Sequence, residues 1–322
     1  MTDLTIIMPT WNKERYIAEA IDSVLRQKTR FSYRIVVADD CSTDGTLDIV
    51  SRYSDSHPGM VEVLRSDRNL KLYRNVLRAY RVAKTPYFCV LDPDDYWLSE
   101  AHIENALSFL EEHREFTVYS TEIERLLPDG TRSLCGFPKE PRVSTFADFL
   151  KGWAVMAFTQ TAVYRNVVFS KGIPEIMENP PFATMEKSFR ADSFRNFLHI
   201  REGSAYYKPD VDACYRITPE GIFAGGNGTR QALLNAWLYI DLWRFDGGRH
   251  PTLLALARRM VPLVKDAGED EVDCERQELE RFFMENAAAL SEGELMLTRR
   301  RSRCWLSRLA ERFGFSSGGK GK

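Results

Sequence analysis

Four short apolar segments, each followed by a stretch with helical spacing, constrain the fold of this chain more than any other feature. The segments are residues 4–8, 34–38, 61–65 and 87–91, and the last is apolar without alternation, as in a strand buried on both faces. Between them, apolar residues recur every three or four positions, as in an amphipathic helix. This alternation over about the first 112 residues predicts an α/β fold with βαβ units, a mostly parallel sheet and helices on both of its faces.

Acidic side chains follow two of these predicted strands. Asp39 and Asp40 come directly after the second strand, and a proline ends the fourth strand among Asp92, Asp94 and Asp95. Right-handed crossovers bring the carboxyl ends of parallel strands to one edge of the sheet, where α/β proteins bind ligands. Such oxygen ligands suit Mg²⁺ or Mn²⁺, usually as one or two carboxylates together with phosphates of the substrate. The sequence therefore predicts a nucleotide and metal site; an acidic turn that caps the next helix is the plain alternative.

Several classes of function are disfavoured by what the sequence lacks. It has no GxxxxGK[ST] motif and no GxGxxG after the first strand, so neither a P-loop nor a dinucleotide fold fits. The net charge is −2, and we expect no binding of nucleic acid. The six cysteines show no metal-ligand spacing, and there is neither a signal-peptide pattern nor a run of about 20 apolar residues. We therefore expect a cytoplasmic protein with reduced thiols.

The first third of the chain resembles the family 2 glycosyltransferases of GT-A fold. Three segments carry the resemblance, in the order and spacing of the family: LTIIMPTWNKERYIAEAIDSVLRQ, IVVADDCSTDGTLDIV and VLDPDDYWLSEAHI. They resemble the family's first strand, turn and helix, its VVDDGSTDGT segment and its DxD segment. The chain departs from the family at Trp11, where Tyr is usual, and at Cys41 and Lys71, where Gly is usual. The resemblance implies a Rossmann-like GT-A domain that binds a nucleotide-sugar and a divalent metal ion.

The resemblance also implies roles for residues of the donor site. Pro9, Thr10 and Trp11 would form the wall of the base pocket. Glu14 would approach the ribose or the pyrophosphate, and Asp40 would accept a hydrogen bond from the base. Alternatives stay open for two of these residues. Trp11 can stack on a base or belong to the core, and Glu14 can instead be an exposed acid in the first turn of the following helix, where it favours the helix dipole.

The residues assigned to the metal and the phosphates come from two segments. Asp92 would contact the ribose or the metal, and Asp94 would be the ligand of Mg²⁺ or Mn²⁺. Asp95 would either support the metal ligands or cap the next helix. Arg216 precedes a glycine-rich stretch; it would meet the diphosphate when this loop closes, or else form a structural salt bridge.

The middle of the chain is expected to select the acceptor. Residues 116–228 would form the acceptor-binding half of the GT-A domain, after the nucleotide-sugar-binding half at 1–115. A hairpin is predicted from strands at 116–126 and 131–135, which flank a Pro-Asp-Gly turn, and a further strand is predicted at 157–164.

Asp192 is the candidate general base, by resemblance to members in which an Asp opens a helix, here at 193–201. In an inverting transfer, such a carboxylate takes the proton of the attacking acceptor hydroxyl. A plain N-cap is the alternative for Asp192, and Glu186 is the substitute base. Asp212 is expected to be a solvated turn residue, and His199 is expected to pack in the core.

Residues 229–322 have a helical composition and end in a basic amphipathic segment. There, Trp305, Leu309 and Phe313 are four residues apart and lie among six arginines, so they would share one helical face. A helix of this kind binds anionic membrane surfaces; a helix that packs on its own domain is the alternative. We therefore expect peripheral binding to the inner leaflet, on the cytoplasmic face of the membrane.

Together these features predict a metal-dependent, inverting glycosyltransferase. It would move a sugar from a nucleoside diphosphate sugar, with UDP favoured, to a hydroxyl of a glycan or a lipid-linked acceptor. The resemblance places such an activity in the synthesis of a bacterial surface polysaccharide or glycolipid. Two alternatives stay open: an inactive relative that serves as an assembly partner, and a sugar nucleotidyltransferase, whose usual glycine-rich loop PTWNKERY lacks.

Overall fold

The computed structural model describes residues 2–136, 138–155, 158–179, 191–218, 228–263 and 270–298, and the chain forms two compact units. The first unit comprises Met1–Phe146, Val155–Pro181 and Phe189–Thr218, and the second comprises Ala147–Ala154, Phe182–Ser188 and Pro219–Lys322. All described residues of the predicted site belong to the first unit. The donor and acceptor halves that we expect to divide near residue 115 are functional assignments, and they stay predictions.

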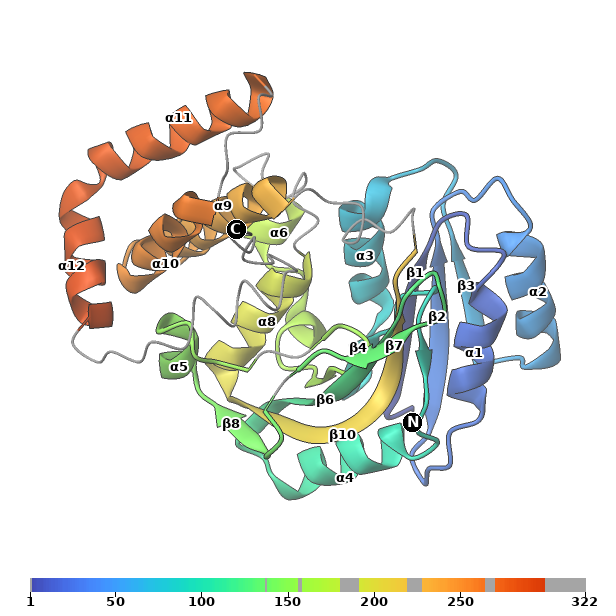
Figure 1. Cartoon of the computed structure of the whole chain (residues 1–322). Helices are drawn as coiled ribbons and strands as arrows, with labels where there is room; N and C mark the ends of the chain where they lie inside the picture. The colour runs from blue at the N-terminus through green and yellow to red at the C-terminus, as the bar shows by residue number, and fades with distance from the viewer. Residues whose placement is uncertain are drawn as a thin grey trace, which may run out of the picture. The chain divides into compact units, whose positions relative to one another are not determined.

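A ten-stranded sheet forms the centre of the first unit within the described residues. The four predicted strands pair in parallel in the order β3-β2-β1-β4, and three helices connect them (Figure 1). These elements are β1 (Leu4–Thr10), α1 (Ile17–Leu25), β2 (Tyr33–Asp39), α2 (Thr46–Ser56), β3 (Val61–Arg65), α3 (Lys71–Val82) and β4 (Tyr87–Val90). The predicted alternation of strands and helices is thus confirmed.

Beyond β4 the sheet becomes mixed and continues in the order β9-β6-β10-β5, with β7 paired to β6 and β8 to β10. β9 runs antiparallel to both of its neighbours, and β10 runs parallel to β6. The elements, in chain order, are β5 (Tyr96–Trp97), α4 (His102–Glu112), β6 (Phe116–Leu126), β7 (Arg132–Leu134), β8 (Arg142–Ser144), α5 (Phe146–Leu150), β9 (Val163–Arg165), η1 (Phe169–Lys171), α6 (Glu175–Glu178), α8 (Ala191–Glu202) and β10 (Ser204–Arg216).

The predicted hairpin is confirmed, whereas the predicted strand that follows it is wrong in extent. In the hairpin, Glu124 of β6 pairs with Leu134 of β7 in an antiparallel ladder. The strand predicted at 157–164 is reduced to β9. The amides of Thr161 and Ala162 both donate to the carbonyl oxygen of Phe158, at 3.3 and 3.1 Å, so the residues before β9 form a turn instead of a ladder.

Helices cover both faces of the parallel strands. On one face, Ile6 and Met8 of β1 pack in a core cluster with residues of α1, α2 and α4. On the other face, the ring of Phe88 in β4 lies 5.6 Å from that of Tyr80 in α3 and 5.5 Å from that of His199 in α8. His199 is fully buried, which confirms its expected place in the core. Two covered faces explain why β4 is apolar without alternation.

The expectation for Asp212 is wrong. This residue lies within β10 and is only 4% exposed, and its carboxylate is 2.8 Å from Nδ1 of His102 at the start of α4. The register of β10 against β6 shifts between Lys208 and Val211 and again before Ala213. Such bulges re-aim side chains along a strand. The partner of Asp212 is 110 residues away, so no local pattern could reveal it.

Helices are the regular elements of the second unit among its described residues, in agreement with the expected helical C-terminal region. It contains α9 (Gly228–Phe245), α10 (Thr252–Met260), η2 (Val261–Leu263), α11 (Asp270–Glu285) and α12 (Ala287–Thr298). Its core includes Leu233 and Ile240 of α9 and Phe283 of α11. The basic amphipathic segment with Trp305 and Phe313 lies outside the described residues, so membrane binding stays a prediction. No described helix has the length and apolar character that crossing a membrane requires.

Candidate active site

Hydrogen bonds join the turn after β1 to the turn after β2 at the carboxyl edge of the sheet. The amide of Asn12 donates to Ser42 Oγ at 3.0 Å, and Asn12 Oδ1 accepts from the amide of Thr43 at 2.8 Å. Asn12 has φ of 51°, a left-handed conformation that asparagine tolerates better than most residues. Trp11 lies in the same turn and is 50% exposed, which excludes a place in the core and leaves its ring accessible to a ligand.

Asp40 lies between the end of β1 and the loop before α3. Its amide donates to the carbonyl oxygen of Thr10 at 2.8 Å, and its Oδ1 accepts from the amide of Leu70 at 2.7 Å. Asp40 is 3% exposed, and Pro9 and Thr10 are also buried. The second carboxylate oxygen of Asp40 has no hydrogen-bond partner within the described part of the chain. This oxygen is the one that can accept from a nucleotide base, as the resemblance predicts.

Both positions at which the chain replaces an expected glycine have left-handed backbone conformations. Cys41 has φ of 61° and Lys71 has φ of 67°. This conformation costs an ordinary residue roughly 1–2 kcal/mol, because the Cβ atom comes close to the following carbonyl oxygen. The backbone at Cys41 and at Lys71, the first residue of α3, therefore keeps a glycine-like conformation although the glycines are absent.

The carboxylate of Glu14 contacts the turn after β2. Its Oε2 accepts from the amide of Gly45 at 2.7 Å, and its own amide donates to the carboxylate of Asp44 at 3.2 Å. Because α1 begins only at Ile17, the alternative of an acid in the first turn of that helix is wrong. One carboxylate oxygen of Glu14 is thus engaged by the protein, and its approach to the ribose or pyrophosphate stays a prediction.

The acidic turn after β4 carries interacting carboxylates. The amide of Asp95 donates to the carbonyl oxygen of Asp92 at 3.0 Å, which closes the turn. Burial, and then the negative charge of Asp94, raises the pKa of Asp92 to about 7. The carboxylate of Asp94 is 2.6 Å from Nζ of Lys13, so an ion pair joins this turn to the turn after β1. The residue predicted to bind the metal is therefore paired with a cation of the protein.

Asp95 connects three segments of the first unit. Its carboxylate is 1% exposed and accepts from the amide of Arg216 at 2.8 Å and from Nε2 of Gln160 at 2.6 Å. Because α4 begins at His102, the helix-capping alternative for Asp95 is wrong. Burial, followed by the charges of Asp94 and Asp92, holds the pKa of Asp95 well above its usual range.

Arg216 forms the structural salt bridge that was one of its two alternatives. Its Nη2 lies 2.6 Å from Oε2 of Glu19, and its Nη1 donates to the carbonyl oxygen of Asp94 at 3.1 Å. A contact with a diphosphate would require Arg216 to exchange Glu19 for the ligand, and it stays a prediction. The glycine-rich loop expected to close next to it, at 219–227, lies outside the described residues.

Asp192 lies in the first turn of α8, and its Oδ1 accepts from the amide of Ser193 at 2.8 Å. Because α8 begins at Ala191, Asp192 is not the N-cap residue. Its assignment as general base stays a prediction. The substitute base, Glu186, lies outside the described residues.

Arg195 is a buried cation one helical turn after Asp192. It is 2% exposed and donates to the hydroxyl groups of Tyr80 at 3.0 Å and Thr159 at 3.3 Å. Its charge opposes the burial that raises the pKa of Asp92, and it also interacts with Asp192. Arg195 therefore favours the ionised form of Asp92, and in the described part of the chain it forms no hydrogen bond to the carboxylate of Asp92 or Asp192.

Asp94 and Asp192 both come within electrostatic range of Asp92, since each contributes to raising the pKa of Asp92. Asp40 belongs to the same edge, but the end of β1 separates β2 from β4. In the described part of the chain, no three His, Cys, Asp or Glu side chains are arranged to hold a metal ion. This arrangement matches a site in which the protein supplies one or two carboxylates and a phosphate-bearing substrate supplies further ligands.

Three polar residues of this region were missed by the sequence interpretation: Lys13, Gln160 and Arg195. Lys13 had a local signal, because a basic residue stands beside Asn12 in the turn after the first strand. Gln160 and Arg195 had none. The bond from Gln160 to Asp95 spans 65 residues, and the bond from Arg195 to Tyr80 spans 115.

Comparisons of the sequence point to one family. The model of the family described as Glycosyl transferase family 2 matches residues 5–169. The uncharacterized protein Rv1520 of Mycobacterium tuberculosis (strain ATCC 25618 / H37Rv) is 28% identical over 220 residues, which cover 68% of this chain and 60% of that protein. Poly(ribitol-phosphate) beta-N-acetylglucosaminyltransferase TarS of Staphylococcus aureus (strain Mu50 / ATCC 700699) is 36% identical over 117 residues, or 35% of this chain and 20% of that protein. The chain thus spans about 60% of the length of its mycobacterial relative.

Two solved structures share the fold. One is S. aureus TarS 1–349 in complex with UDP-GlcNAc, with a TM-score of 0.56 and 18% identity over 80% of this chain and 72% of that chain. The other is the mannosyltransferase PcManGT from Pyrobaculum calidifontis in complex with GDP-Man and Mn²⁺, with a TM-score of 0.52 and 17% identity over 96% and 85%. The matched segment 5–169 makes up half of the sequence and contains all four parallel strands and the three motifs. The chain therefore belongs to glycosyl transferase family 2 and has a GT-A fold.

Proposed function

We propose that this chain transfers a sugar from a nucleoside diphosphate sugar, with UDP the favoured nucleotide, to a hydroxyl of a glycan or a lipid-linked acceptor. The observation that carries the proposal is the position of Asp92 and Asp94 in the turn after β4, at the carboxyl edge of a GT-A sheet, with Asp192 within electrostatic range of Asp92. Solved structures of the same fold contain UDP-GlcNAc in TarS and GDP-Man with Mn²⁺ in PcManGT, which supports a nucleotide-sugar donor.

The nucleotide would bind at the ends of β1 and β2. Trp11 is exposed there and offers an aromatic face to the base, while Pro9 and Thr10 would form the adjoining wall. Asp40 keeps one oxygen for a base N–H, because only Oδ1 is engaged by Leu70. A carboxylate oxygen needs a donor on the base. Uracil supplies one with its N3–H, whereas a base edge that presents only acceptors does not.

Asp92 and Asp94 would hold Mg²⁺ or Mn²⁺ together with the diphosphate of the donor, and the bound ion would supply positive charge to the leaving group. The donor set fits this mode, since both carboxylates lie in one turn at the carboxyl edge of the sheet. Asp94 must then exchange its ion pair with Lys13 for the metal. The displaced Lys13 ammonium and the guanidinium of Arg216 would remain near the phosphates.

Asp192 would act as the general base. It takes the proton of the acceptor hydroxyl while the acceptor oxygen forms a bond to the anomeric carbon, and the bond from that carbon to the diphosphate breaks. A single displacement of this kind inverts the anomeric configuration and needs no covalent enzyme intermediate. Arg195, one helical turn further along α8, interacts electrostatically with Asp192 and would hold positive charge beside the base.

The acceptor would belong to a bacterial surface polysaccharide or glycolipid. TarS, whose name gives poly(ribitol-phosphate) as its acceptor, supports a surface polymer as the class of product. The basic segment at 299–313 would place the enzyme on the cytoplasmic face of the membrane, next to a lipid-linked acceptor.

The first test is calorimetric titration of UDP and GDP in the presence of Mn²⁺ or EDTA. Wild type is compared with Asp94→Ala and with the control Asp55→Ala, which removes an exposed acid from α2. We expect Mn²⁺-dependent binding of UDP that is at least tenfold weaker in Asp94→Ala and unchanged in Asp55→Ala. If neither nucleotide binds under any condition, the donor site is refuted.

The competing proposal is an inactive relative that acts as an assembly partner. The Lys13–Asp94 ion pair favours it, because this pair occupies the carboxylate that would bind the metal ion. Metal-dependent UDP binding, without hydrolysis or transfer of any UDP-sugar in a donor panel, would support this alternative over the transferase.

A further inference from the structure

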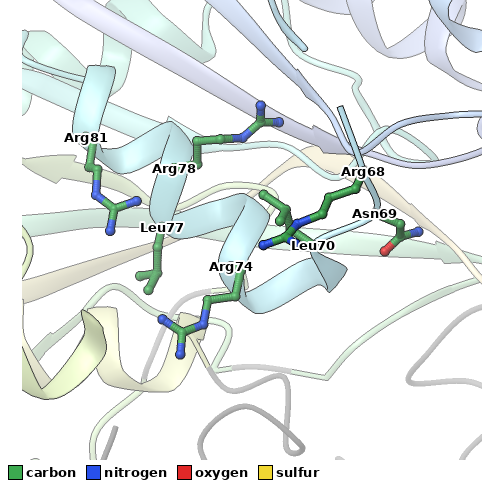
Figure 2. Close-up of a pocket in the computed structure, with 7 residues that line it drawn as sticks. All are labelled: Arg68, Asn69, Leu70, Arg74, Leu77, Arg78 and Arg81. Atoms are coloured by element: carbon green, nitrogen blue, oxygen red, sulfur yellow. The ribbon is translucent and has the colours of Figure 1, made fainter. Parts of the chain in front are cut away.

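A pocket of about 580 Å³ lies beside α3, and arginine side chains form most of its described lining (Figure 2). The lining residues are Arg68, Asn69, Leu70, Arg74, Leu77, Arg78 and Arg81. None of these residues is acidic, although the whole chain carries 46 acidic side chains against 44 lysines and arginines. The positive charge of this pocket is therefore a local arrangement and not a consequence of a basic composition.

The arginines are spread along one helix and the loop before it. Figure 2 shows Arg74, Leu77 and Arg81 extending from one side of α3, while Arg68 extends from the preceding loop toward the helix. At a rise of 1.5 Å per residue, positions 74 and 81 are separated by about 10 Å along the helix axis. A volume of about 580 Å³ lies in the range of small-molecule pockets. The pocket is thus large and long enough for more than one anionic group.

Arg78 is held rigidly at the wall of the pocket. Its guanidinium donates to the carbonyl oxygens of Arg65, Leu64 and Asp39, at 2.5–3.0 Å, and to Oδ1 of Asn75 at 2.7 Å. All four acceptors are neutral, so these bonds position the charge without cancelling it. The carboxylates of Asp39, Asp40 and Asp67 act on Arg78 through space, but none forms a hydrogen bond with it in the described part of the chain.

The other arginines of the lining differ in their partners. Arg68 is exposed, and its side chain has no ion pair or hydrogen bond with any described residue. Arg74 donates to the carbonyl oxygen of Glu178 at 2.5 Å, and Arg81 pairs with the Glu178 carboxylate at 3.0 Å. Arg81 thus has an acidic partner, whereas Arg68 has none among the described residues. Together with Arg78, whose hydrogen bonds go to neutral oxygens, Arg68 gives the pocket the character of an anion-binding site.

We propose that the arginine pocket beside α3 binds a chain segment that carries successive phosphate groups. The planar guanidinium fork of arginine matches phosphate oxygens in two-point contacts, and several arginines along about 10 Å match several phosphates better than a single ion. The occupant is a phosphate-bearing polymer or oligomer; free inorganic phosphate is the other source of the same chemistry.

The arginine pocket is distinct from the proposed donor site. Trp11, Asp92 and Asp94 do not line it, and neither does Asp192. The two sites are neighbours at two places: Leu70 lines the pocket while its amide donates to Asp40, and Arg78 donates to the carbonyl oxygen of Asp39. Phosphate binding in the pocket therefore does not depend on the transferase proposal, and each can fail without the other.

The test is calorimetric titration of the full chain with inorganic tripolyphosphate and with orthophosphate, in EDTA and about 150 mM salt. The variants are Arg68→Gln, Arg81→Gln and the double variant. They change two exposed side chains, and the Arg81–Glu178 pair is a surface ion pair of small worth to stability. The control is Arg114→Gln, which removes an exposed arginine outside the pocket. UDP with Mn²⁺ is titrated into every variant in parallel.

We expect wild type to bind tripolyphosphate at least tenfold more tightly than orthophosphate. The double variant should lose at least tenfold in tripolyphosphate affinity, while Arg114→Gln binds as wild type does and UDP binding is unchanged throughout. Absence of tripolyphosphate binding, or equal binding by the double variant, would overturn the proposal. If orthophosphate binds as tightly as tripolyphosphate, the pocket is a site for free phosphate, and the proposal of a polymer segment is overturned. Poly-glutamate is titrated under the same conditions as a polyanion without phosphate. If it binds as tightly as tripolyphosphate, the preference for phosphate is overturned.

Discussion

Asp95 allows a sharp test of the hydrogen-bond network beneath the candidate active site. We compare Asp95→Ala, which removes the carboxylate, with Asp95→Asn, which removes its charge and keeps its shape. The carboxylate accepts from the Arg216 amide and from Nε2 of Gln160, and it is almost fully buried. In Asp95→Ala both donors lose their acceptor. A buried donor without a partner costs about 1–3 kcal/mol, so the free energy of unfolding should fall by about 2–5 kcal/mol.

The amide of Asp95→Asn can restore both bonds. Its oxygen can accept from the Arg216 amide, and its NH₂ group needs an acceptor on the other side. Oε1 of Gln160 is buried and has no partner among the described residues, so a 180° rotation of the Gln160 amide provides that acceptor. The variant also removes a buried carboxyl group whose charged form is disfavoured, since burial raises the pKa of Asp95. We therefore expect its free energy of unfolding to lie within about 1 kcal/mol of wild type.

Urea denaturation followed by tryptophan fluorescence measures both variants, since Trp97 is buried two positions from Asp95. The control is Asp129→Ala, in which an exposed turn carboxylate loses one bond, from the Thr131 amide. It should cost well under 1 kcal/mol, because the freed amide reaches water. If Asp95→Ala is as stable as the control, or if Asp95→Asn is as unstable as Asp95→Ala, the assigned role is refuted. Loss of Mn²⁺-dependent UDP binding in Asp95→Asn would instead indicate a metal ligand.

Three further predictions address the base, a buried histidine and the helical unit. Asp192→Asn should lower kcat for sugar transfer about 10²–10⁴-fold while UDP binding stays unchanged, because only the proton acceptor is lost; wild-type turnover would refute the assignment. Burial lowers the pKa of His199 to about 3. The contribution of this group to the free energy of unfolding is therefore complete above its unfolded pKa, near 6.5, and is lost as the pH falls toward 3. Urea titrations at pH 7 and 4.5 should show a loss of about 2.5 kcal/mol from this group that His199→Phe removes, and an unchanged pH dependence in that variant would contradict it. In α12, a Cβ on Gly293 would overlap the carbonyl oxygen of Pro251, so Gly293→Ala should cost about 1–3 kcal/mol by circular dichroism, and an unchanged urea midpoint would contradict this packing.

The local part of the fold followed from patterns that each lie within one element or its neighbour. The apolar segments predicted β1 to β4, and the Pro-Asp-Gly turn predicted the β6–β7 hairpin. Cys41 and Lys71 stand where the family usually has glycine, and both positions do have positive φ. In contrast, the strand predicted at 157–164 was too long, because an apolar run does not show which of its amides find partners across a ladder.

The candidate site was predictable in its residues and not in their partners. Acids at the ends of β2 and β4 are a local feature, and right-handed crossovers bring them to one edge. Lys13 was visible in the turn after the first strand, although its pairing with Asp94 was not. The functional roles of these residues stay predictions until the titrations and turnover assays are made.

The sequence by itself determined the α/β alternation, the parallel first half of the sheet and its acidic carboxyl edge, because these depend on side-chain periodicity and on the handedness of crossovers. Only the tertiary structure decided which groups neutralise or satisfy those acids, and which arginines surround the pocket beside α3. The physical reason is distance along the chain: the deciding contacts join residues 65 to 121 positions apart, and they depend on strand order and on bulges that no local period specifies. These pairs are Gln160 with Asp95, Lys13 with Asp94, His102 with Asp212, and Arg216 with Asp95.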